Sequence, residues 1–350
     1  MDIEEKIPWI RLAISKGIGP ITFWNLLKKA NGSAKNALNL VDEISSEEAA
    51  EDLLIQHNKS GFCILTAYEK YFPQKLKLIK DCPPILSVKG NLELLNKRSI
   101  AIVGARNASL LGKIFALKIA KSIGTNGFAV VSGMARGIDC SAHEGSIETG
   151  TIAIFAGGLD IIYPPENANL CDSILKNKGV IISEMMPGTP IDPSLFPRRN
   201  RIIAGVSEGV VLIEAAIKSG SLITAKFALE QGKEVFAVPG NPSDPRSKGC
   251  NLLIKQGAVL VDSVEDILSC FNLNSPKVEQ IQESVDIFPI KEDTLSLKTS
   301  ILSELSTTPI SIEILFQHQN CGLPNLLVAL GELEAEGKIR RYANSEVSLL

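Results

Sequence analysis

The sequence predicts an α/β protein whose central unit is a doubly wound parallel sheet, with a helical segment on either side of it. Between residues 98 and 272, short runs rich in β-branched residues alternate with stretches of helical periodicity. The runs show no alternation of polar and apolar residues, which is typical of parallel strands buried on both faces. They read SIAIVG, AVVSG, TIAIFAG, VIISE, GVVLIEA, EVFAVPG and AVLVDS. We therefore expect an extended, Rossmann-like sheet of at least seven strands.

The composition limits the class of protein. The chain has 350 residues, 45% of them hydrophobic, which is enough for two or three domains. Because the net charge is −3, contact with nucleic acid would require local clusters of cations. Seven cysteines without C-x-x-C spacing and three scattered histidines predict neither a disulfide framework nor a metal site. The chain shows no signal peptide and no membrane-length apolar run, so we expect a cytoplasmic protein without membrane contact.

Residues 1–60 are expected to form a small helical domain of the SAM or helix-hairpin-helix type. Its helical pattern is interrupted by a tight Gly-Ile-Gly-Pro turn at residues 17–20. Such a turn can offer backbone N–H groups to a DNA phosphate. The alternative, a bundle that contacts protein or caps the main domain, is favoured. Residues 61–97 are interpreted as a connecting segment, in which one extended run, ILSVKG, joins the edge of the sheet.

The region after the sheet is divided into a linker and a last domain. Residues 273–296 carry few apolar groups and an acidic excess, which predicts a linker. Residues 297–350 show three helical patterns and a short pair of strands, the size and order of a winged-helix domain. The third helical pattern carries Glu332, Glu334 and Glu336. An acidic recognition helix favours contact with protein over contact with DNA.

The ligand site of such a sheet is expected beyond the carboxyl ends of its strands. The first turn reads VGARNAS, and Arg106 stands where the dinucleotide fingerprint needs a glycine, which argues against an NAD site. After Gly104, Arg106 and the helix-capping Ser109 can offer a charged fork and backbone donors to a phosphate. A structural role for Arg106 is an equal alternative. In the second turn, SGMARGIDCSAHEG, Arg136 joins the rim, and structural hydrogen bonding is favoured over acid–base catalysis.

The densest cluster of cations lies in FPRRNR, which follows the fourth strand. Phosphate contact is favoured here over a solvated loop, because the run continues into the apolar IIAG. The SGSLITAK run after the next strand should add N–H donors at a helix start and one lysine. We expect Glu214, at the end of that strand, to hold the arginines by ion pairing. The residues predicted here are Phe196, Arg198, Arg199, Asn200, Arg201, Ser219, Gly220, Ser221 and Lys226.

Taken together, these motifs closely resemble the DprA/Smf (DNA-processing protein A) family, in the family's order and through about residues 98–262. The family's G-S/A-R motif falls on residues 104–106, F-P-x-R-N-R on 196–201 and S-G-S-L-x-T-A on 219–225. The resemblance implies an extended Rossmann fold that binds single-stranded DNA, protects it and loads the RecA recombinase during natural transformation. It also implies a homodimer. RecA-contact residues are assigned to no position.

The resemblance further implies a binding protein with no catalytic residue, no metal and no cofactor. The alternative is a LOG-like nucleoside monophosphate phosphoribohydrolase, but the P-G-G-x-G-T-x-x-E motif of those enzymes is missing. A winged-helix regulator with a Rossmann sensor is a third interpretation, weakened by the acidic third helix. The apolar segment at residues 250–263 is expected to place an apolar helix next to the last parallel strand. We expect this edge to form an isologous dimer interface around Asn251, Ile254 and Leu260.

Overall fold

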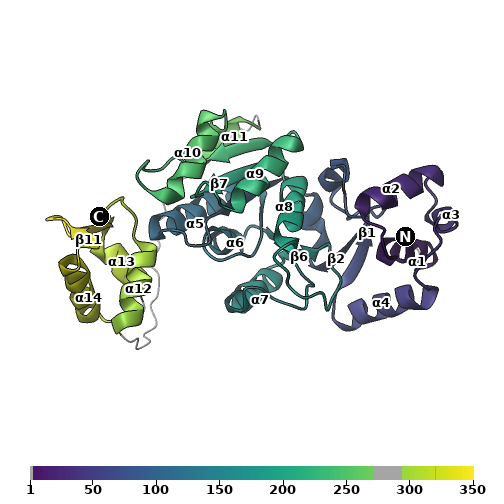
Figure 1. Cartoon of the computed structure of the whole chain (residues 1–350), viewed down its shortest axis with the longest axis horizontal. Helices are drawn as coiled ribbons and strands as arrows, with labels where there is room; N and C mark the ends of the chain where they lie inside the picture. Colours follow the sequence, from purple (N-terminus) through teal and green to yellow (C-terminus); the bar gives the residue numbers. More distant parts are fainter. Residues whose placement is uncertain (1–2, 272–293, 320) are drawn as a thin grey trace.

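The computed structural model of the protein describes residues 3–271, 294–319 and 321–350. The large α/β domain lies in the middle of the molecule, with the N-terminal helices at one end and the C-terminal domain at the other (Figure 1). The linker expected at residues 273–296 falls almost entirely outside the described residues. Within the described part of the chain, no helix is long and apolar enough to cross a membrane.

A nine-stranded sheet organises the large domain. Its strand order is β1-β2-β6-β5-β4-β3-β7-β8-β9, and the seven strands from β3 to β9 run parallel. The strands are β1 (Cys63–Thr66), β2 (Ile85–Gly90), β3 (Ser99–Gly104), β4 (Ala129–Ser132), β5 (Thr151–Phe155), β6 (Val180–Ser183), β7 (Gly209–Ile213), β8 (Glu234–Ala237) and β9 (Val259–Leu260). The predicted Rossmann-like, doubly wound sheet is confirmed.

The stretch from 61 to 97, interpreted from sequence as a connecting segment, supplies two strands of this sheet instead of one. β2 pairs antiparallel with β6, and β1 pairs antiparallel with β2. The apolar faces of both strands join the cores of their neighbours, with Leu65 and Leu86 buried. A short strand such as β1 gives a weak local signal, and only its pairing across the sheet stabilises it.

Helices cover both faces of the sheet, and successive strand residues enter different cores. Ala101 and Val103 of β3 pack with α8 (Leu195–Val206), α9 (Ser221–Glu230) and α10 (Lys248–Lys255). Ile100 and Ile102 pack with α5 (Leu110–Thr125), α6 (Ile138–Ser146) and α11 (Val264–Ser269). This two-sided burial is the reason why the strands read as continuous apolar runs. α7 (Ala168–Lys176) covers β5 and β6.

The N-terminal helices cap the β1–β2 end of the sheet. They are α1 (Ile3–Ile14), α2 (Pro20–Lys29), α3 (Ala34–Leu38) and α4 (Glu47–Lys59). Gly17, at φ +79°, makes the predicted turn between the first two helices. Trp24 donates its indole N–H to the Cys82 carbonyl at 2.7 Å, and Trp9 and Phe23 share one apolar core with the sheet. The helices therefore pack against the large domain itself.

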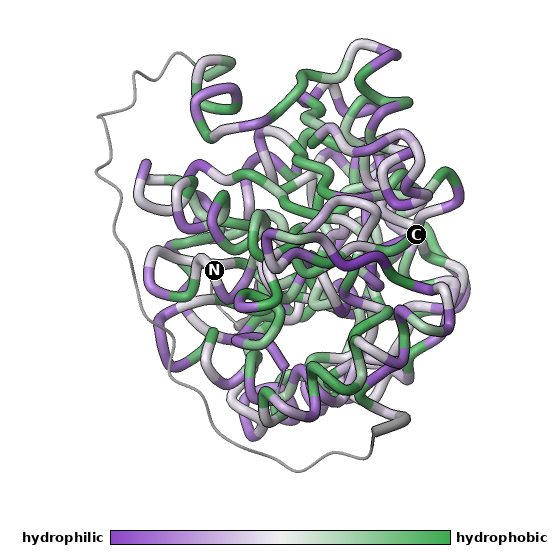
Figure 2. The backbone as a smooth tube through the Cα atoms, turned by 90° about the vertical axis from the view of Figure 1, so that its left-hand side faces the viewer, coloured by the Kyte–Doolittle hydropathy of each residue, from purple (hydrophilic) through white to green (hydrophobic). Residues whose placement is uncertain are grey.

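The C-terminal domain has the element order of a winged helix. Its elements are α12 (Thr294–Glu304), β10 (Ile310–Ser311), α13 (Ile312–His318), α14 (Leu323–Ala335), β11 (Ile339–Arg341) and β12 (Glu346–Leu349). The expected strand pair is a three-stranded antiparallel sheet, because β10 also pairs with β12. This domain packs on α5, whose Leu110 is buried in the core of the C-terminal domain. Figure 2 views the molecule from that end.

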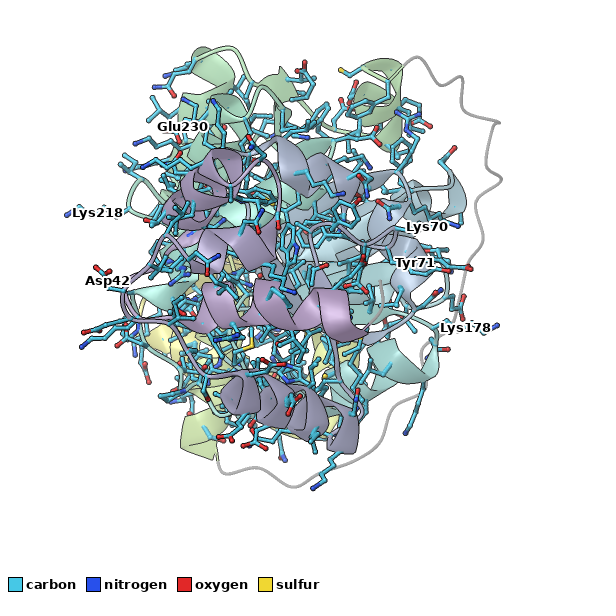
Figure 3. All side chains as sticks on the ribbon, turned by 90° about the vertical axis from the view of Figure 1, so that its right-hand side faces the viewer. Asp42, Lys70, Tyr71, Lys178, Lys218 and Glu230 are labelled. Carbon is cyan, nitrogen blue, oxygen red and sulfur yellow. The ribbon has the colours of Figure 1, made fainter. Side chains whose placement is uncertain are left out.

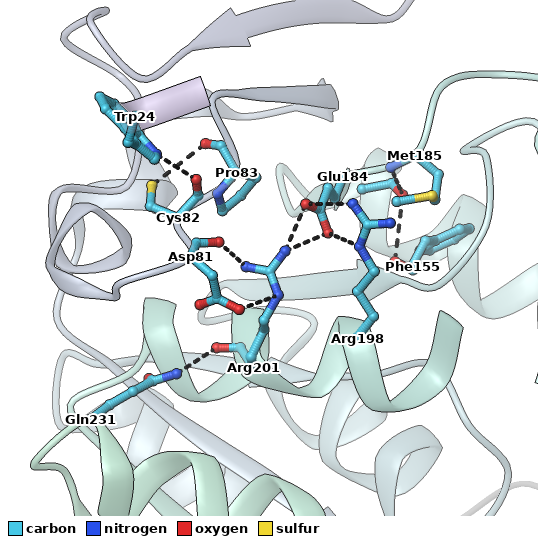
Figure 4. A network of polar contacts seen from close by, with 11 residues as sticks. Trp24, Asp81, Cys82, Pro83, Phe155, Glu184, Met185, Arg198, Arg201 and Gln231 are labelled. Carbon is cyan, nitrogen blue, oxygen red and sulfur yellow. Dashed lines mark hydrogen bonds and ion pairs between the residues drawn. The ribbon is translucent and has the colours of Figure 1, made fainter. Parts of the chain in front are cut away.

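The FPRRNR run lies inside α8, where a loop was one of the two sequence interpretations. Pro197 falls in the first turn, where its missing N–H costs nothing, and the apolar IIAG run continues the helix. Arg201 is buried and pairs through Nη2 with Glu184 at 2.6 Å and through Nε with Asp81 at 3.2 Å. Arg198 pairs with the same Glu184 from a more exposed position (Figure 4). These ion pairs tie α8 to the end of β6 and to the loop before β2.

We predict that Arg201→Ala destabilises the protein by about 3–5 kcal/mol, because the buried Glu184 carboxylate loses its best partner and the Asp81 contacts go with it. Arg198→Ala is the matched control on the same helix. Its cost should stay within about 1 kcal/mol, since its exposed pair contributes little and Glu184 keeps Arg201. Urea unfolding of both variants measures the difference. Equal midpoints for the two variants would contradict an anchoring role of Arg201.

Candidate functional site

A cavity of about 530 Å³ opens at the carboxyl ends of β3 and β7. Its walls come from the turn after β3, from the first half of α8, and from the loop and first turn of α9. Eight of the residues predicted from sequence line it: Gly104, Arg106, Phe196, Arg199, Asn200, Ser219, Gly220 and Ser221. The strand-end rim expected from the fold class is therefore a concave site.

The turn that carries Arg106 is held by close backbone packing. A Cβ at Gly104 would lie 1.9 Å from the Ile213 carbonyl oxygen, so no side chain fits between β3 and β7 there. Gly137, at φ +74°, packs equally tightly from the start of α6, where a Cβ would lie 2.4 Å from the Ala105 carbonyl oxygen. Two glycines thus fix the direction in which the turn presents Arg106.

Arg106 presents an exposed guanidinium to the cavity. The group lies over the Phe196 ring at 5.0 Å from the ring centre, a cation–π contact. Among the described residues, no carboxylate forms an ion pair with it. The stacked ring leaves the N–H donors at the edge of the guanidinium free for a planar or tetrahedral anion. Arg106 is therefore positioned and charged, yet not neutralised.

Arg199 supplies a buried positive charge at the inner wall of the cavity. It is only 6% exposed, and its Nη1 donates to the Ile154 carbonyl at 2.7 Å and to the Gly133 carbonyl. A Cβ at Gly133 would lie 1.9 Å from Nη1, so this glycine makes room for the guanidinium. Burial lowers the pKa of Arg199 to about 10, while Asp139 opposes the shift, so the group stays charged at neutral pH. Its Nε is buried without a hydrogen-bond partner.

The turn before α9 completes the cavity. Ser219 and Ser221 share a hydrogen bond between their hydroxyls at 2.7 Å, and Asn200 donates its amide to the Gly220 carbonyl at 3.2 Å. The turn is thereby tied to α8. The exposed Lys218, which precedes the turn, points into solvent (Figure 3). The helix start and the lysine add further positive potential at the mouth of the cavity.

Asp139 is the carboxylate that lines the cavity. Its Oδ2 accepts hydrogen bonds from the backbone N–H groups of Gly133 at 3.1 Å and of Ala135 at 3.3 Å. Burial raises its pKa, and the Arg199 charge and these hydrogen bonds act against the rise. His143 lies deeper, bonded to the Thr151 hydroxyl at 2.7 Å, and burial lowers its pKa to about 3, so it is neutral. Both groups make the structural hydrogen bonds favoured for this stretch.

The remaining predicted residues lie outside this cavity. Arg198 and Arg201 point to Glu184, so of the three arginines in the FPRRNR run only Arg199 lines the cavity, where it joins Arg106. Arg136 pairs with Glu166 beside a small adjoining cavity. The exposed Lys226 makes only a 3.7 Å pair with Glu230.

Ser109 makes the predicted helix cap but does not line the cavity, and Glu214 has a structural role in place of the predicted one. Ser109 caps α5 by accepting from the Gly112 N–H at 3.0 Å, and it is buried. The Glu214 carboxylate accepts from the Ser109 N–H at 2.7 Å and from the Ser109 hydroxyl, so it does not hold the arginines as expected. The reason is the strand order: β7 is the neighbour of β3, which places Glu214 beside the turn after β3.

Sequence reasoning missed two cations of the cavity, Lys218 and Arg246. Both follow parallel strands, β7 and β8, so their position after a strand end was an available signal. Neither residue belongs to a dense run of basic residues, and such runs were the signal used to predict cations of the site. Among the residues that the structure describes, no group of three or more His, Cys, Asp or Glu side chains could hold a metal ion.

The chain is similar in sequence and in structure to known proteins. The chain is 35% identical over 288 residues to Protein Smf of Escherichia coli, covering 82% of this chain and 77% of that protein. It is 45% identical over 218 residues to DNA processing protein DprA of Bacillus subtilis, covering 61% and 73%. The solved structure of DprA from Streptococcus pneumoniae matches with 32% identity and a TM-score of 0.66, over 78% of this chain and 100% of that chain.

A solved structure of DNA processing protein A from Helicobacter pylori, for which a single-stranded DNA binding mode is described, matches with 28% identity. It covers 60% of this chain and 95% of that chain, with a TM-score of 0.55. Residues 3–59 match the DprA-like N-terminal HHH domain. Residues 63–272, which contain the whole sheet and the strand-end cavity, match the family described as DNA recombination-mediator protein A. The chain belongs to the DNA recombination-mediator protein A family.

Proposed function

We propose that the strand-end cavity binds the phosphate backbone of single-stranded DNA and that the protein acts as a recombination mediator. The observation that carries this proposal is the convergence on one cavity of two arginines, Arg106 and Arg199, that form no carboxylate ion pair within the described ranges. A buried guanidinium with an unpartnered Nε is costly unless an anion compensates it. Single-stranded DNA, for which a binding mode of the Helicobacter pylori relative is described, carries such an anion, a phosphate, at every nucleotide.

The site favours the backbone of the strand over the identity of its bases. Arginines and helix-start N–H groups recognise phosphate, which every sequence shares. The aromatic groups at the cavity are few: Phe196 is covered on one face by Arg106 and lies 5.8 Å from the Tyr163 ring. Stacking on a tilted aromatic pair tolerates all four bases. We therefore expect weak sequence preference and strong dependence on salt.

The finer function follows the family: the protein would protect single-stranded DNA and load the RecA recombinase during natural transformation. A binding role without catalysis is also part of the proposal. The alternative, hydrolysis of nucleoside monophosphates, would need a catalytic carboxylate at the cavity. Asp139 is the candidate there, but two backbone N–H groups hold it in a structural position and the phosphoribohydrolase motif is missing from the chain.

We predict that Arg106→Ala weakens binding to oligonucleotides of any base sequence, because one phosphate contact is lost. The slope of log affinity against log salt should flatten by about 0.7, the contribution of one phosphate on a single strand. Thermal stability should stay near that of the unaltered protein, since the Arg106 side chain forms no ion pair with any residue that the structure describes. Fluorescence anisotropy with labelled oligo-dT and mixed-sequence DNA across a salt series measures both quantities.

Arg198→Ala is the control for this experiment. The substitution removes the same charge from the same helix, but the Arg198 side chain does not line the cavity. The affinity for DNA and the salt slope should therefore equal those of the unaltered protein. Nucleoside monophosphates, which offer a single phosphate, should compete poorly. An Arg106→Ala protein that binds as tightly as the original, with an unchanged slope, would place the DNA site elsewhere. Tight competition by monophosphates would favour the nucleotide-processing alternative.

We also propose a homodimer, which exposed apolar side chains at one edge of the sheet support. At the β9 edge of the sheet, Leu252 is 41% and Leu260 is 45% exposed, a pair of large apolar side chains next to the half-buried Ile254. Asn251, expected at the centre of the interface, instead has its side-chain amide bonded within its own chain. It accepts from the Gly240 N–H and donates to the Gly240 carbonyl. An isologous contact along this edge would cover the apolar side chains and end the sheet.

We predict that Leu260→Arg converts the dimer to a monomer, because two added charges would face each other across the two-fold axis. Leu260 lies outside the core, so the fold should tolerate the change. Leu78→Arg, at an 80% exposed leucine of η1 (Gln74–Leu78), is the matched control and should leave the mass unchanged. Light scattering reports the mass. A Leu260→Arg protein that stays dimeric would rule out this edge as the interface.

A further inference from the structure

Arg246 connects the strand-end cavity to the C-terminal domain. It follows β8 in the short helix η4 (Pro245–Ser247), and its side chain lines the cavity together with Arg106 and Arg199. The same guanidinium donates through Nη2 to the carbonyl oxygen of Leu305 at 2.8 Å. Leu305 is the residue that follows α12, so the bond crosses from the large domain to the C-terminal domain. One side chain thus takes part in both the site and the domain contact.

The guanidinium of Arg246 is held on two sides and open on the third. Its Nε and Nη2 donate to the two carboxylate oxygens of Asp244 at 3.2 and 3.0 Å. Asp244 is itself buried and accepts from the Arg246 N–H at 2.9 Å, so it cannot turn away. Within the described residues, Nη1 has no protein acceptor. A planar fork fixed in this way presents its remaining edge in one direction.

The contact that holds the Leu305 carbonyl is well packed. Leu110 of α5 is 1% exposed within the core of the C-terminal domain, and Leu111 and Ile114 pack against the same core. Lys113 of α5 pairs with Glu304 at 3.1 Å, one residue before Leu305. A carbonyl at the end of a helix lacks an intrahelical donor and carries partial negative charge, so it suits an arginine. The docked domain therefore places a fixed acceptor beside Arg246.

We propose that Arg246 is a further phosphate-binding residue of the cavity and that the docked C-terminal domain positions it for this role. The proposal rests on the proposed function of the cavity. Asp244 and Leu305 occupy the Nε and Nη2 donors of the guanidinium, and Nη1 contacts a phosphate of the bound strand. Because docking orients the donor, docking strengthens DNA binding. By reciprocity, bound DNA strengthens docking by the same factor.

The first test separates the charge of Arg246 from its orientation. Arg246→Ala should weaken oligo-dT binding at least about tenfold, the loss of one hydrogen bond between charged groups. It should also flatten the salt slope by about 0.7. Arg246→Lys keeps the positive charge, so the salt slope should not change, but it loses the planar guanidinium. Its affinity should therefore lie between those of the unaltered protein and Arg246→Ala. Lys113→Met loosens docking away from the cavity, and it should lower affinity while the slope stays unchanged.

The second test follows docking by hydrogen exchange of the full-length protein. Oligo-dT should slow amide exchange in residues 110–116 and 297–305, the two sides of the domain contact. The slowing should persist in Lys113→Met, whose free form exchanges faster, and it should disappear in Arg246→Ala. DNA that leaves exchange at both segments unchanged in the original protein would overturn the positioning role of the C-terminal domain.

Arg106→Ala distinguishes failure of this proposal from failure of the proposed function. If Arg106→Ala loses affinity and slope while Arg246→Ala keeps both, Arg246 is no phosphate contact and the cavity remains the DNA site. If neither variant changes either quantity, the cavity is not the DNA site, and both proposals fall together.

Discussion

The buried guanidinium of Arg199 is the constraint on which the site depends. It bridges the carboxyl ends of β4 and β5 through the carbonyls of Gly133 and Ile154, and so docks α8 across the strand ends. A Cβ at Gly133 would displace the guanidinium, and among the described residues Asp139 is the carboxylate whose charge acts on Arg199. The position of α8 in turn sets the place of Phe196 and, through Asn200, of the turn before α9. A single buried cation thus organises two of the three walls of the cavity, α8 and the turn before α9.

The arginines of one short run serve two different purposes because they lie on a helix. Successive residues on an α-helix are about 100° apart, so residues three apart share a face and direct neighbours do not. Arg198 and Arg201 accordingly meet at Glu184, where the buried Arg201 anchors the helix, whereas Arg199 points to the strand ends. The anchoring by Arg201 lets α8 carry a second buried charge near the cavity. Stability and recognition are therefore separate functions of adjacent residues.

Unpaired cations gather where the strands end, although the whole chain carries a net charge of −3. Several cations elsewhere are paired: Lys75 and Arg98 with Glu208, Lys113 with Glu304, and Lys298 with Glu332 and Glu336. At the cavity, Arg106 and Lys218 have no such partner in the described part of the chain. The convergence of these cations on one cavity gives the site a local positive potential. An acidic protein can in this way still offer a surface for an anionic strand.

The sequence by itself determined the doubly wound sheet, the order of the flanking domains and the glycine and arginine motifs at the strand ends. These follow from local periodicity and from turns that lie within a few residues of one another. Only the tertiary structure decided which arginines face the cavity, because burial depends on partners as distant as Asp81 and Glu184. It also decided that Glu214 serves Ser109, since strand order is not encoded locally. The Arg246 side chain is held by the carbonyl of Leu305 in the C-terminal domain, a contact between residues far apart in the chain that no short stretch of sequence can reveal.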